Sequence, residues 1–218
     1  MDYKNHKDLC KLACVWLQRG KAQYSHGCEF AVSEVGNGHE IADAIGFKDI
    51  PDHSLGYNSV LIEVKVSRSD FLADSKKKHR VYGANSLGDL RYYMVPEGLI
   101  KPDEVPYGWG LLYVNERGHV LPQKGVAKIY KDMYKKVNTN DKGKDYLNPN
   151  SDKHGEWYIL THINKRISSW QTNSRHDSWR ETFRENKKLR KSTSEIVRTL
   201  KRRVKTLEQK LSKNKDPK

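Results

Sequence analysis

Three charged residues interrupt the most apolar, β-prone segments of the sequence. Glu63 and Lys65 stand in the run Ser-Val-Leu-Ile-Glu-Val-Lys-Val at 59–66, and Asp43 stands in the shorter apolar run 41–46. Because successive side chains of a strand alternate between its two faces, Glu63 and Lys65 share one face of the first run. A charge that is buried without a partner is strongly destabilising. These residues must therefore be matched by each other, by another group or by a metal ion.

Two carboxylates and a lysine are the residue types that phosphodiester hydrolysis requires. Carboxylates bind hard divalent cations, which clamp the phosphate oxygens and lower the pKa of an attacking water. A lysine ammonium within reach can orient or help to deprotonate that water and stabilise the pentacovalent transition state. Asp43, Glu63 and Lys65 therefore predict a hydrolytic site that uses Mg²⁺, with Mn²⁺ as an alternative. The simpler interpretation is an internal ion pair that holds two strands together.

The segments around these residues have the patterns of an α/β (α+β) core. Apolar residues at helical spacing predict an amphipathic helix over 7–18. Strands are expected at 28–35, 41–46 and 59–66, followed by a helix from Ser67 to about Tyr82. Further strands are expected at 91–95 and 110–114, with 126–130 as a third candidate. The core therefore has the predicted order α-β-β-β-α-β-β.

The second half of the chain changes in composition. Lys, Asn, Asp and Gly dominate the stretch that follows residue 134, so we expect a folded core at 1–134, a mobile polar loop at 135–156 and a basic helical tail at 157–218. The tail carries a short heptad pattern, formed by Val197, Leu200, Val204, Leu207 and Leu211. This seam predicts either homo-oligomerisation through a coiled coil or a helix that folds back onto its own core.

The ordered motifs resemble those of the PD-(D/E)XK nuclease superfamily over roughly the first 115 residues. The run Glu-Val-Lys-Val-Ser-Arg-Ser-Asp-Phe-Leu-Ala-Asp at 63–74 is the more specific part. It is similar to the MmcB-like DNA repair proteins and to uncharacterised phage relatives of them. The segments 92–96, 98–100 and 108–112 also match the shape of that group. The resemblance implies a restriction-endonuclease-like core, in which helices flank a mixed central sheet.

The same resemblance assigns roles to individual residues. It implies that Asp43 and Glu63 are metal ligands and that Lys65 is the catalytic lysine. Val64, which stands between them, is a further expected metal ligand and can act only through its backbone carbonyl. Glu34 is the expected auxiliary acid. Glu34 stands at a strand end, whereas many members of the superfamily place this acid on the first helix, so Glu29 and Glu40 are alternatives to it.

Residues that follow the catalytic strand are expected to contact nucleic acid. They are Ser67, Arg68 and the cationic cluster Lys76, Lys77, Lys78 and Arg80. Each phosphate contact from such residues would add affinity that salt weakens and that does not depend on base sequence. For Ser67, a capping box with Asp70 is the alternative explanation. For the cluster, the alternative is a solvated helix face.

Charge and cysteine content narrow the classes of protein. Forty-one Lys and Arg against 27 Asp and Glu give a formal charge of +14, which favours a polyanionic partner, DNA first, without separating DNA from RNA. No run of roughly 20 apolar residues predicts a membrane span, and the expected location is the cytoplasm of a bacterial or phage-infected cell.

Three cysteines do not suggest a disulfide framework. With His26 they could bind zinc, although buried, unliganded thiols are favoured.

Two classes of function are consistent with these residues. The first is a metal-dependent deoxyribonuclease that acts in repair, recombination or phage DNA processing. The second is a binding module with an inactive nuclease fold and a basic, oligomerising arm. The intact set of Asp43, Glu63 and Lys65 favours the enzyme, because such charges are costly to bury without a metal. A histidine-based nuclease is disfavoured, because the nine histidines form no paired motif.

Overall fold

The computed structural model describes residues 5–49, 55–74, 77, 80–135, 142–173, 188, 195 and 197–205. The chain divides into two compact units, Met1–Thr161 and His162–Lys218. The first unit contains the sheet and the charged residues considered above. Within the described residues, no helix is long and apolar enough to cross a membrane.

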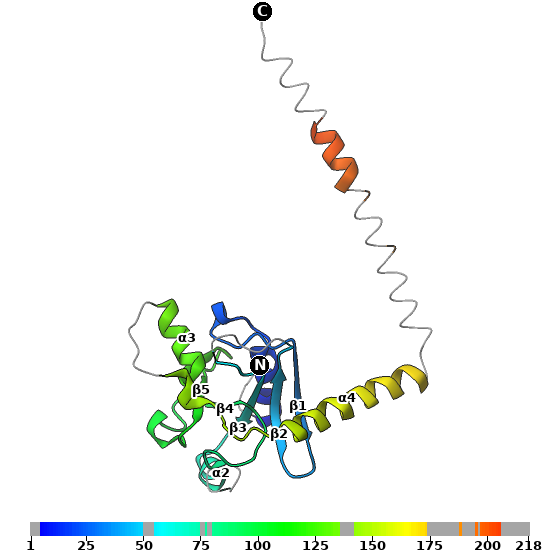
Figure 1. Ribbon diagram of the computed structural model, residues 1–218. Helices are drawn as coiled ribbons and strands as arrows, with labels where there is room; N and C mark the ends of the chain where they lie inside the picture. The colour runs from blue at the N-terminus through cyan, green and yellow to red at the C-terminus, as the bar shows by residue number, and fades with distance from the viewer. Residues whose placement is uncertain are drawn as a thin grey trace, which may run out of the picture. The chain divides into compact units, whose positions relative to one another are not determined.

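The first unit is built on one mixed sheet of six strands, which lie in sequence order from β1 to β6 (Figure 1). The β3–β4 and β4–β5 pairs are parallel and the other neighbouring pairs are antiparallel. Every residue of β3 is buried, as expected for the predicted central strand. The predicted α/β class with a mixed central sheet is confirmed. The strands are β1 Phe30–Gly36, β2 Ile41–Phe47, β3 Ser59–Val64, β4 Leu90–Pro96, β5 Trp109–Val114 and β6 Val120–Lys124.

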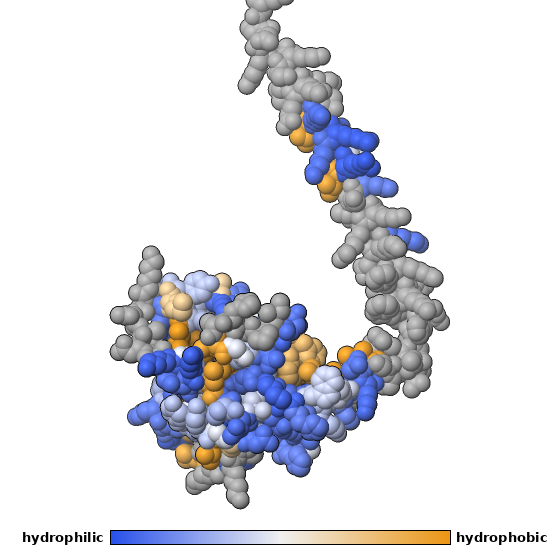
Figure 2. Space-filling model, viewed as in Figure 1, coloured by the Kyte–Doolittle hydropathy of each residue, from blue (hydrophilic) through white to orange (hydrophobic). Residues whose placement is uncertain are grey.

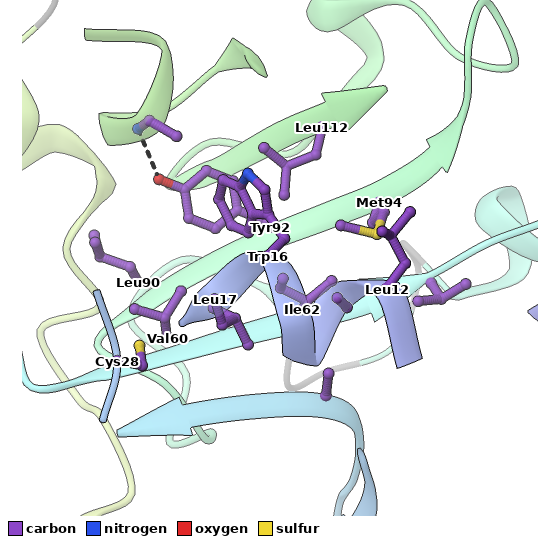
Figure 3. Close-up of a cluster of buried hydrophobic side chains, with 14 of the residues drawn as sticks. Leu12, Trp16, Leu17, Cys28, Val60, Ile62, Leu90, Tyr92, Met94 and Leu112 are labelled. Carbon is purple, nitrogen blue, oxygen red and sulfur yellow. Dashed lines mark hydrogen bonds between the residues drawn. The ribbon is translucent and has the colours of Figure 1, made fainter. Parts of the chain in front are cut away.

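Helix α1, His6–Leu17, covers one face of this sheet. Its buried side chains include those that the helical spacing predicted, together with Cys10: Leu9, Cys10, Leu12, Ala13, Trp16 and Leu17. Figure 3 shows three of them above apolar side chains of β3, β4 and β5. The Asn5 side chain caps the helix by accepting a hydrogen bond of 2.8 Å from the backbone N–H of Asp8. The alternating residues Val60, Ile62 and Val64 face α1, so Glu63 and Lys65 belong to the opposite face.

The remaining helices are short, except for the last. They are η1 Lys21–Gln23, α2 Arg68–Asp74, η3 Pro102–Glu104, α3 Val126–Tyr134, η4 Gly143–Tyr146 and α4 Lys153–Asn173. The expected strand at 126–130 is wrong. Val126, Ala127 and Tyr130 are buried at helical spacing, and the hydroxyl of Tyr92 accepts a 3.0 Å hydrogen bond from the N–H of Ala127 (Figure 3). Strand β6, which contains Pro122, was not predicted and pairs only with β5.

The helix predicted from Ser67 to about Tyr82 is shorter in the structure. Helix α2 ends at Asp74, and the backbone N–H of Arg80 donates to the carbonyl of Lys77 in a turn. This early end lets the side chain of Arg80 enter the interior, where it is 2% exposed.

The segment 135–156, expected to be a mobile loop after the core, contains helical elements and buried side chains in the structure. Element η4 and the start of α4 lie inside the range expected to be a mobile loop, and Tyr146, Asn148 and Glu156 are buried there. The carboxylate of Glu156 accepts a 3.0 Å hydrogen bond from the N–H of Gly88 and a 2.7 Å bond from the hydroxyl of Ser59. Polar side chains therefore fix a segment whose composition predicted a loop.

The tail is described over residues 197–205, which are helical. Val197, Leu200 and Val204 of the predicted seam are each about half exposed on this helix, among cationic side chains (Figure 2). Leu207 and Leu211 lie outside the described residues. Whether the seam pairs with another helix stays a prediction.

Candidate active site

Asp43 occupies the point where β2 separates from β3. The last paired residues at this end are Ala44 on β2 and Ile62 on β3. Beyond them, Asp43 Oδ2 accepts a hydrogen bond of 2.8 Å from the backbone N–H of Val64. At this point the Asp43 side chain, not a backbone carbonyl of β2, accepts the hydrogen bond from β3. This bond holds the carboxylate of Asp43 in the fork, the place where β2 and β3 separate.

The three sequence-predicted residues meet at this fork. Lys65 Nζ lies 3.3 Å from Glu63 Oε2 and 3.9 Å from Asp43 Oδ2. Glu63 is 2% exposed and Lys65 is 6% exposed, so their charges are largely removed from water. The side chain of Asp43 is 16% exposed, which leaves the fork accessible at one side.

Three further charged residues complete the cluster. From the sequence, Glu40 is an alternative auxiliary acid, Arg80 is expected to contact nucleic acid and Asp74 has no assigned role. Arg80 places guanidinium nitrogens 2.8 Å from Glu63 Oε2, 2.8 Å from Asp74 Oδ2 and 2.8 Å from Glu40 Oε1. Asp74 Oδ1 also lies 3.5 Å from Lys65 Nζ. Helical spacing could have identified Asp74, because it follows the buried Phe71 by three residues on α2. No sequence pattern placed Arg80, since it follows the end of that helix.

Glu63 is the least satisfied acid of the cluster. Burial raises its pKa to about 7; the charges of Asp43 and Asp74 add to this rise, while Arg80 and Lys65 oppose it. Its Oε1 atom is buried and has no hydrogen-bond partner among the described residues. A buried carboxylate oxygen without a donor fits a site that accepts a cation.

Lys65 and Asp74 keep their charges. Burial acts to lower the pKa of Lys65, but the carboxylates of Glu63, Asp74 and Asp43 outweigh it and raise the pKa above its ordinary value. Burial acts to raise the pKa of Asp74, but the hydrogen bonds and charges of Arg80 and Lys77 outweigh it and hold that pKa well below its ordinary value. Lys65 is therefore an ammonium ion at neutral pH.

The three candidates for the auxiliary acid lie in different surroundings. Glu34 is exposed on β1 and has a left-handed backbone with φ 54°. Its charge contributes to the raised pKa of Cys10, after burial and Asp43. Glu29 is exposed and accepts a 3.1 Å hydrogen bond from the N–H of Asp49. Glu40 alone joins the buried cluster, through Arg80 and the N–H of Leu87.

The residues predicted to contact nucleic acid have mixed positions. Ser67 Oγ accepts a 3.2 Å hydrogen bond from the N–H of Asp70, as the capping interpretation predicted. Arg68 is exposed and hydrogen-bonded to Glu104. Lys77 is half exposed, and its ammonium lies 2.8 Å from Asp74. Lys76 and Lys78 lie outside the described residues. The expectation that Arg80 faces DNA is wrong, because its guanidinium is buried among carboxylates.

The cysteines and His26 do not converge on one site. His26 is buried between the hydroxyls of Tyr57 and Tyr92, at 2.9 and 3.0 Å. Among the described residues, the one group of three or more donors close enough to share a metal ion combines His6, Cys10 and Asp43.

Comparison of this chain with protein-family models, with curated proteins and with solved structures finds no match.

Proposed function

We propose that this protein is a metal-dependent nuclease of the PD-(D/E)XK type that hydrolyses phosphodiester bonds in DNA, within a restriction-endonuclease-like core. The observation that carries the proposal is the meeting of Asp43, Glu63 and Lys65 at the β2–β3 fork, with Glu63 Oε1 unpaired among the described residues. An aspartate, a glutamate and a lysine from two neighbouring strands are the set that this chemistry needs.

Asp43 and Glu63 would hold the divalent cation, Mg²⁺ in the first place and Mn²⁺ as the alternative, with the carbonyl of Val64 as a further ligand. When bound, such a cation neutralises charge on the scissile phosphate and lowers the pKa of an attacking water. The two carboxylates supply the oxygen ligands that hard cations prefer. Arg80 supports the site by holding Glu63 Oε2, which leaves the buried Oε1, without a hydrogen-bond partner among the described residues, as the oxygen that would bind the cation.

Lys65 would orient the attacking water and stabilise negative charge in the transition state. Its raised pKa means that it carries a proton at neutral pH, so it acts as a fixed cation and hydrogen-bond donor. Three carboxylates hold this ammonium within 4 Å, at 3.3, 3.5 and 3.9 Å, and fix its position before substrate arrives. Such preorganisation is the main source of electrostatic catalysis.

A second candidate is a non-catalytic module that binds nucleic acid. The observation in its favour is that Arg80 and Lys65 already pair with Glu63, so the cluster is partly neutralised without a metal. In that case Glu63 and Arg80 would hold the sheet together, and binding would rest on the basic tail. Metal-dependent cleavage separates the two functions.

The test of the proposal is incubation of the purified protein with linear, circular, nicked and branched DNA, with Mg²⁺, Mn²⁺ or a chelator. We expect cleavage of at least one substrate in the presence of metal and none with chelator. The same panel made of RNA determines whether the activity is confined to DNA.

The metal ligands can be tested separately from cleavage. We expect Asp43→Asn and Glu63→Gln each to remove Mg²⁺ and Mn²⁺ binding, because each loses one ligand charge at nearly constant shape. Isothermal titration calorimetry would measure this, with Glu116→Gln as the control for an exposed acid outside the fork. Unchanged affinity in both fork variants would exclude these residues as ligands.

Metal binding at Glu63 should also depend on pH. The pKa of this carboxyl is raised from 4.5 to about 7 in the folded, metal-free protein. Between these values the folded state keeps a proton that the unfolded chain loses, so stability without metal falls as pH rises through this window. Since a cation must displace that proton, Mg²⁺ affinity should increase with pH up to about 7 and then level off. Affinity that is constant across this range would contradict the role of Glu63.

The tail should contribute phosphate contacts. We expect the double variant Lys201→Gln, Lys205→Gln to bind DNA more weakly and with a smaller salt dependence, because each lost phosphate contact lowers the log–log slope by about 0.9. Fluorescence anisotropy at several salt concentrations would measure the slope. The control is Lys142→Gln, Lys144→Gln, which removes two exposed charges from the first unit. Equal slopes in both variants would show that Lys201 and Lys205 make no phosphate contacts.

A further inference from the structure

Two side chains of α1 face Asp43 from the side opposite to Lys65. His6 and Cys10 stand four residues apart on this helix, so both project from the same side of it. His6 Nε2 lies 3.3 Å from Asp43 Oδ1, and Cys10 Sγ lies 3.5 Å from His6 Nδ1. One donor atom from each of the three residues falls within 4.8 Å of the others.

We propose that His6, Cys10 and Asp43 form a binding site for a transition-metal ion, Zn²⁺ in the first place, next to the proposed hydrolytic site. A thiolate, an imidazole and a carboxylate together select a borderline-soft ion such as Zn²⁺ over Mg²⁺, which prefers oxygen ligands alone. The inference goes beyond the proposed nuclease activity, because the soft ligands His6 and Cys10 have no part in that activity.

The donor separations suit such an ion. Bonds of about 2.0 to 2.3 Å at tetrahedral angles place neighbouring ligand atoms roughly 3.3 to 3.7 Å apart. One ion can use only one ring nitrogen of His6. Its Nε2 lies 3.3 Å from Asp43 Oδ1, which meets this spacing, and 4.0 Å from Cys10 Sγ, which is slightly longer than this spacing. Binding would therefore require small side-chain adjustments and no movement of α1 relative to β2.

The surroundings favour a cation at this place. Cys10 is 1% exposed, whereas the side chain of His6 is 40% exposed, so the site is closed on the thiol side and open on the imidazole side. The carboxylate of Asp43, which lies 3.3 Å from His6 Nε2, supplies negative charge that attracts a metal ion. Three protein ligands leave a fourth position for water.

Asp43 can serve both sites because its two oxygens face different groups. Oδ1 faces His6, while Oδ2 accepts the hydrogen bond from Val64 and lies 3.9 Å from Lys65. A carboxylate with one oxygen on each side can bridge two metal ions. The thiol–imidazole pair lies on the α1 side of the fork, and the ammonium of Lys65 lies on the other side.

The test is titration of the full-length, chelator-treated protein with Co²⁺, which replaces Zn²⁺ and gives a thiolate-to-metal charge-transfer band. We expect the wild type and Cys14→Ser to show this band, Cys10→Ser to lack it, and added Zn²⁺ to abolish it. His6→Ala should weaken Zn²⁺ binding by at least about tenfold, since even outer-shell changes cost that much. No band in the wild type, or a band that survives in Cys10→Ser, would overturn the inference.

The wild type also separates this inference from the proposed function. A Cys10-dependent band in a protein that cleaves no DNA would support the metal site and contradict the proposed nuclease activity. Mg²⁺-dependent cleavage without such a band would support the nuclease activity and contradict the metal site. The band reports the thiolate ligand directly and requires no activity.

Discussion

Replacement of Lys65 by alanine is expected to lower the rate of DNA cleavage by roughly two or more orders of magnitude, the size of general-base and electrostatic contributions. DNA and metal binding should persist, because the variant keeps Asp43 and Glu63. The fold should also persist. Arg80 remains 2.8 Å from Glu63 Oε2, so the loss of Lys65 does not leave that oxygen without a cationic partner.

The matched control is Lys77→Ala. Lys65 and Lys77 both pair with Asp74 Oδ1, at 3.5 and 2.8 Å, but the side chain of Lys77 is 53% exposed and outside the fork. The control should therefore retain single-turnover cleavage at saturating protein concentration, where loss of the expected phosphate contact of Lys77 does not limit the rate. Single-turnover assays and thermal melts with and without metal would be measured for both variants. If Lys65→Ala instead melts far below the wild type in both conditions, Lys65 is a structural partner and its catalytic role is wrong.

Arg80→Met should produce the largest loss of stability among single changes in the cluster. Its guanidinium pairs with Glu40, Glu63 and Asp74, and it is 2% exposed. Removal of one partner from a buried ionic network costs about 3 to 5 kcal/mol, because the remaining charges keep their desolvation penalty. Methionine keeps much of the side-chain volume, so the loss reports charge more than packing. Urea denaturation would measure the free energy of unfolding.

Arg68→Met is the control for this experiment. Arg68 also pairs with a carboxylate, that of Glu104, but at the surface, where such pairs add little stability. We expect its denaturation midpoint to stay close to that of the wild type. Equal behaviour of the two arginine variants would show that the Arg80 cluster does not stabilise the fold.

The sequence alone was sufficient to identify the site residues whose position follows from the alternation of side chains along a strand. In β3, apolar residues at every second position put Glu63 and Lys65 together on one face, and the apolar surroundings of Asp43 identified it as the third member. The helical spacing of the first segment likewise identified the side chains of α1 that pack on the sheet. These patterns are local, so they can be read without knowledge of the fold.

The rest of the site depends on contacts between distant segments. Arg80 reaches Glu63 and Glu40 because α2 ends at Asp74, and a run of cationic residues gives no sign of that end. The density of positive charge at 76–80 predicted an exposed cluster, and for this reason the burial of Arg80 was not predicted. Likewise, His6 meets Asp43 only because α1 crosses the fork, although the two residues are far apart in the sequence.

The misassigned helix α3 and the segment 135–156 have a related cause. A short apolar run such as 126–130 fits a strand or a helix equally well, and packing on Tyr92 selected the helix. Asn148 and Glu156 are polar, and composition therefore predicted a loop. Their burial is explained by backbone groups of Ser86 and Gly88, to which they hydrogen-bond.

The central claim is that the Asp43, Glu63 and Lys65 fork hydrolyses DNA, and cleavage in ¹⁸O-labelled water with Mg²⁺ tests it most directly. For the wild type, we expect one labelled oxygen in the terminal phosphate that each cleavage event creates, and none in the hydroxyl end, with no products from Glu63→Gln at equal protein concentration. The account would be contradicted by intact DNA across the whole substrate panel, or by equal cleavage in the wild type and Glu63→Gln.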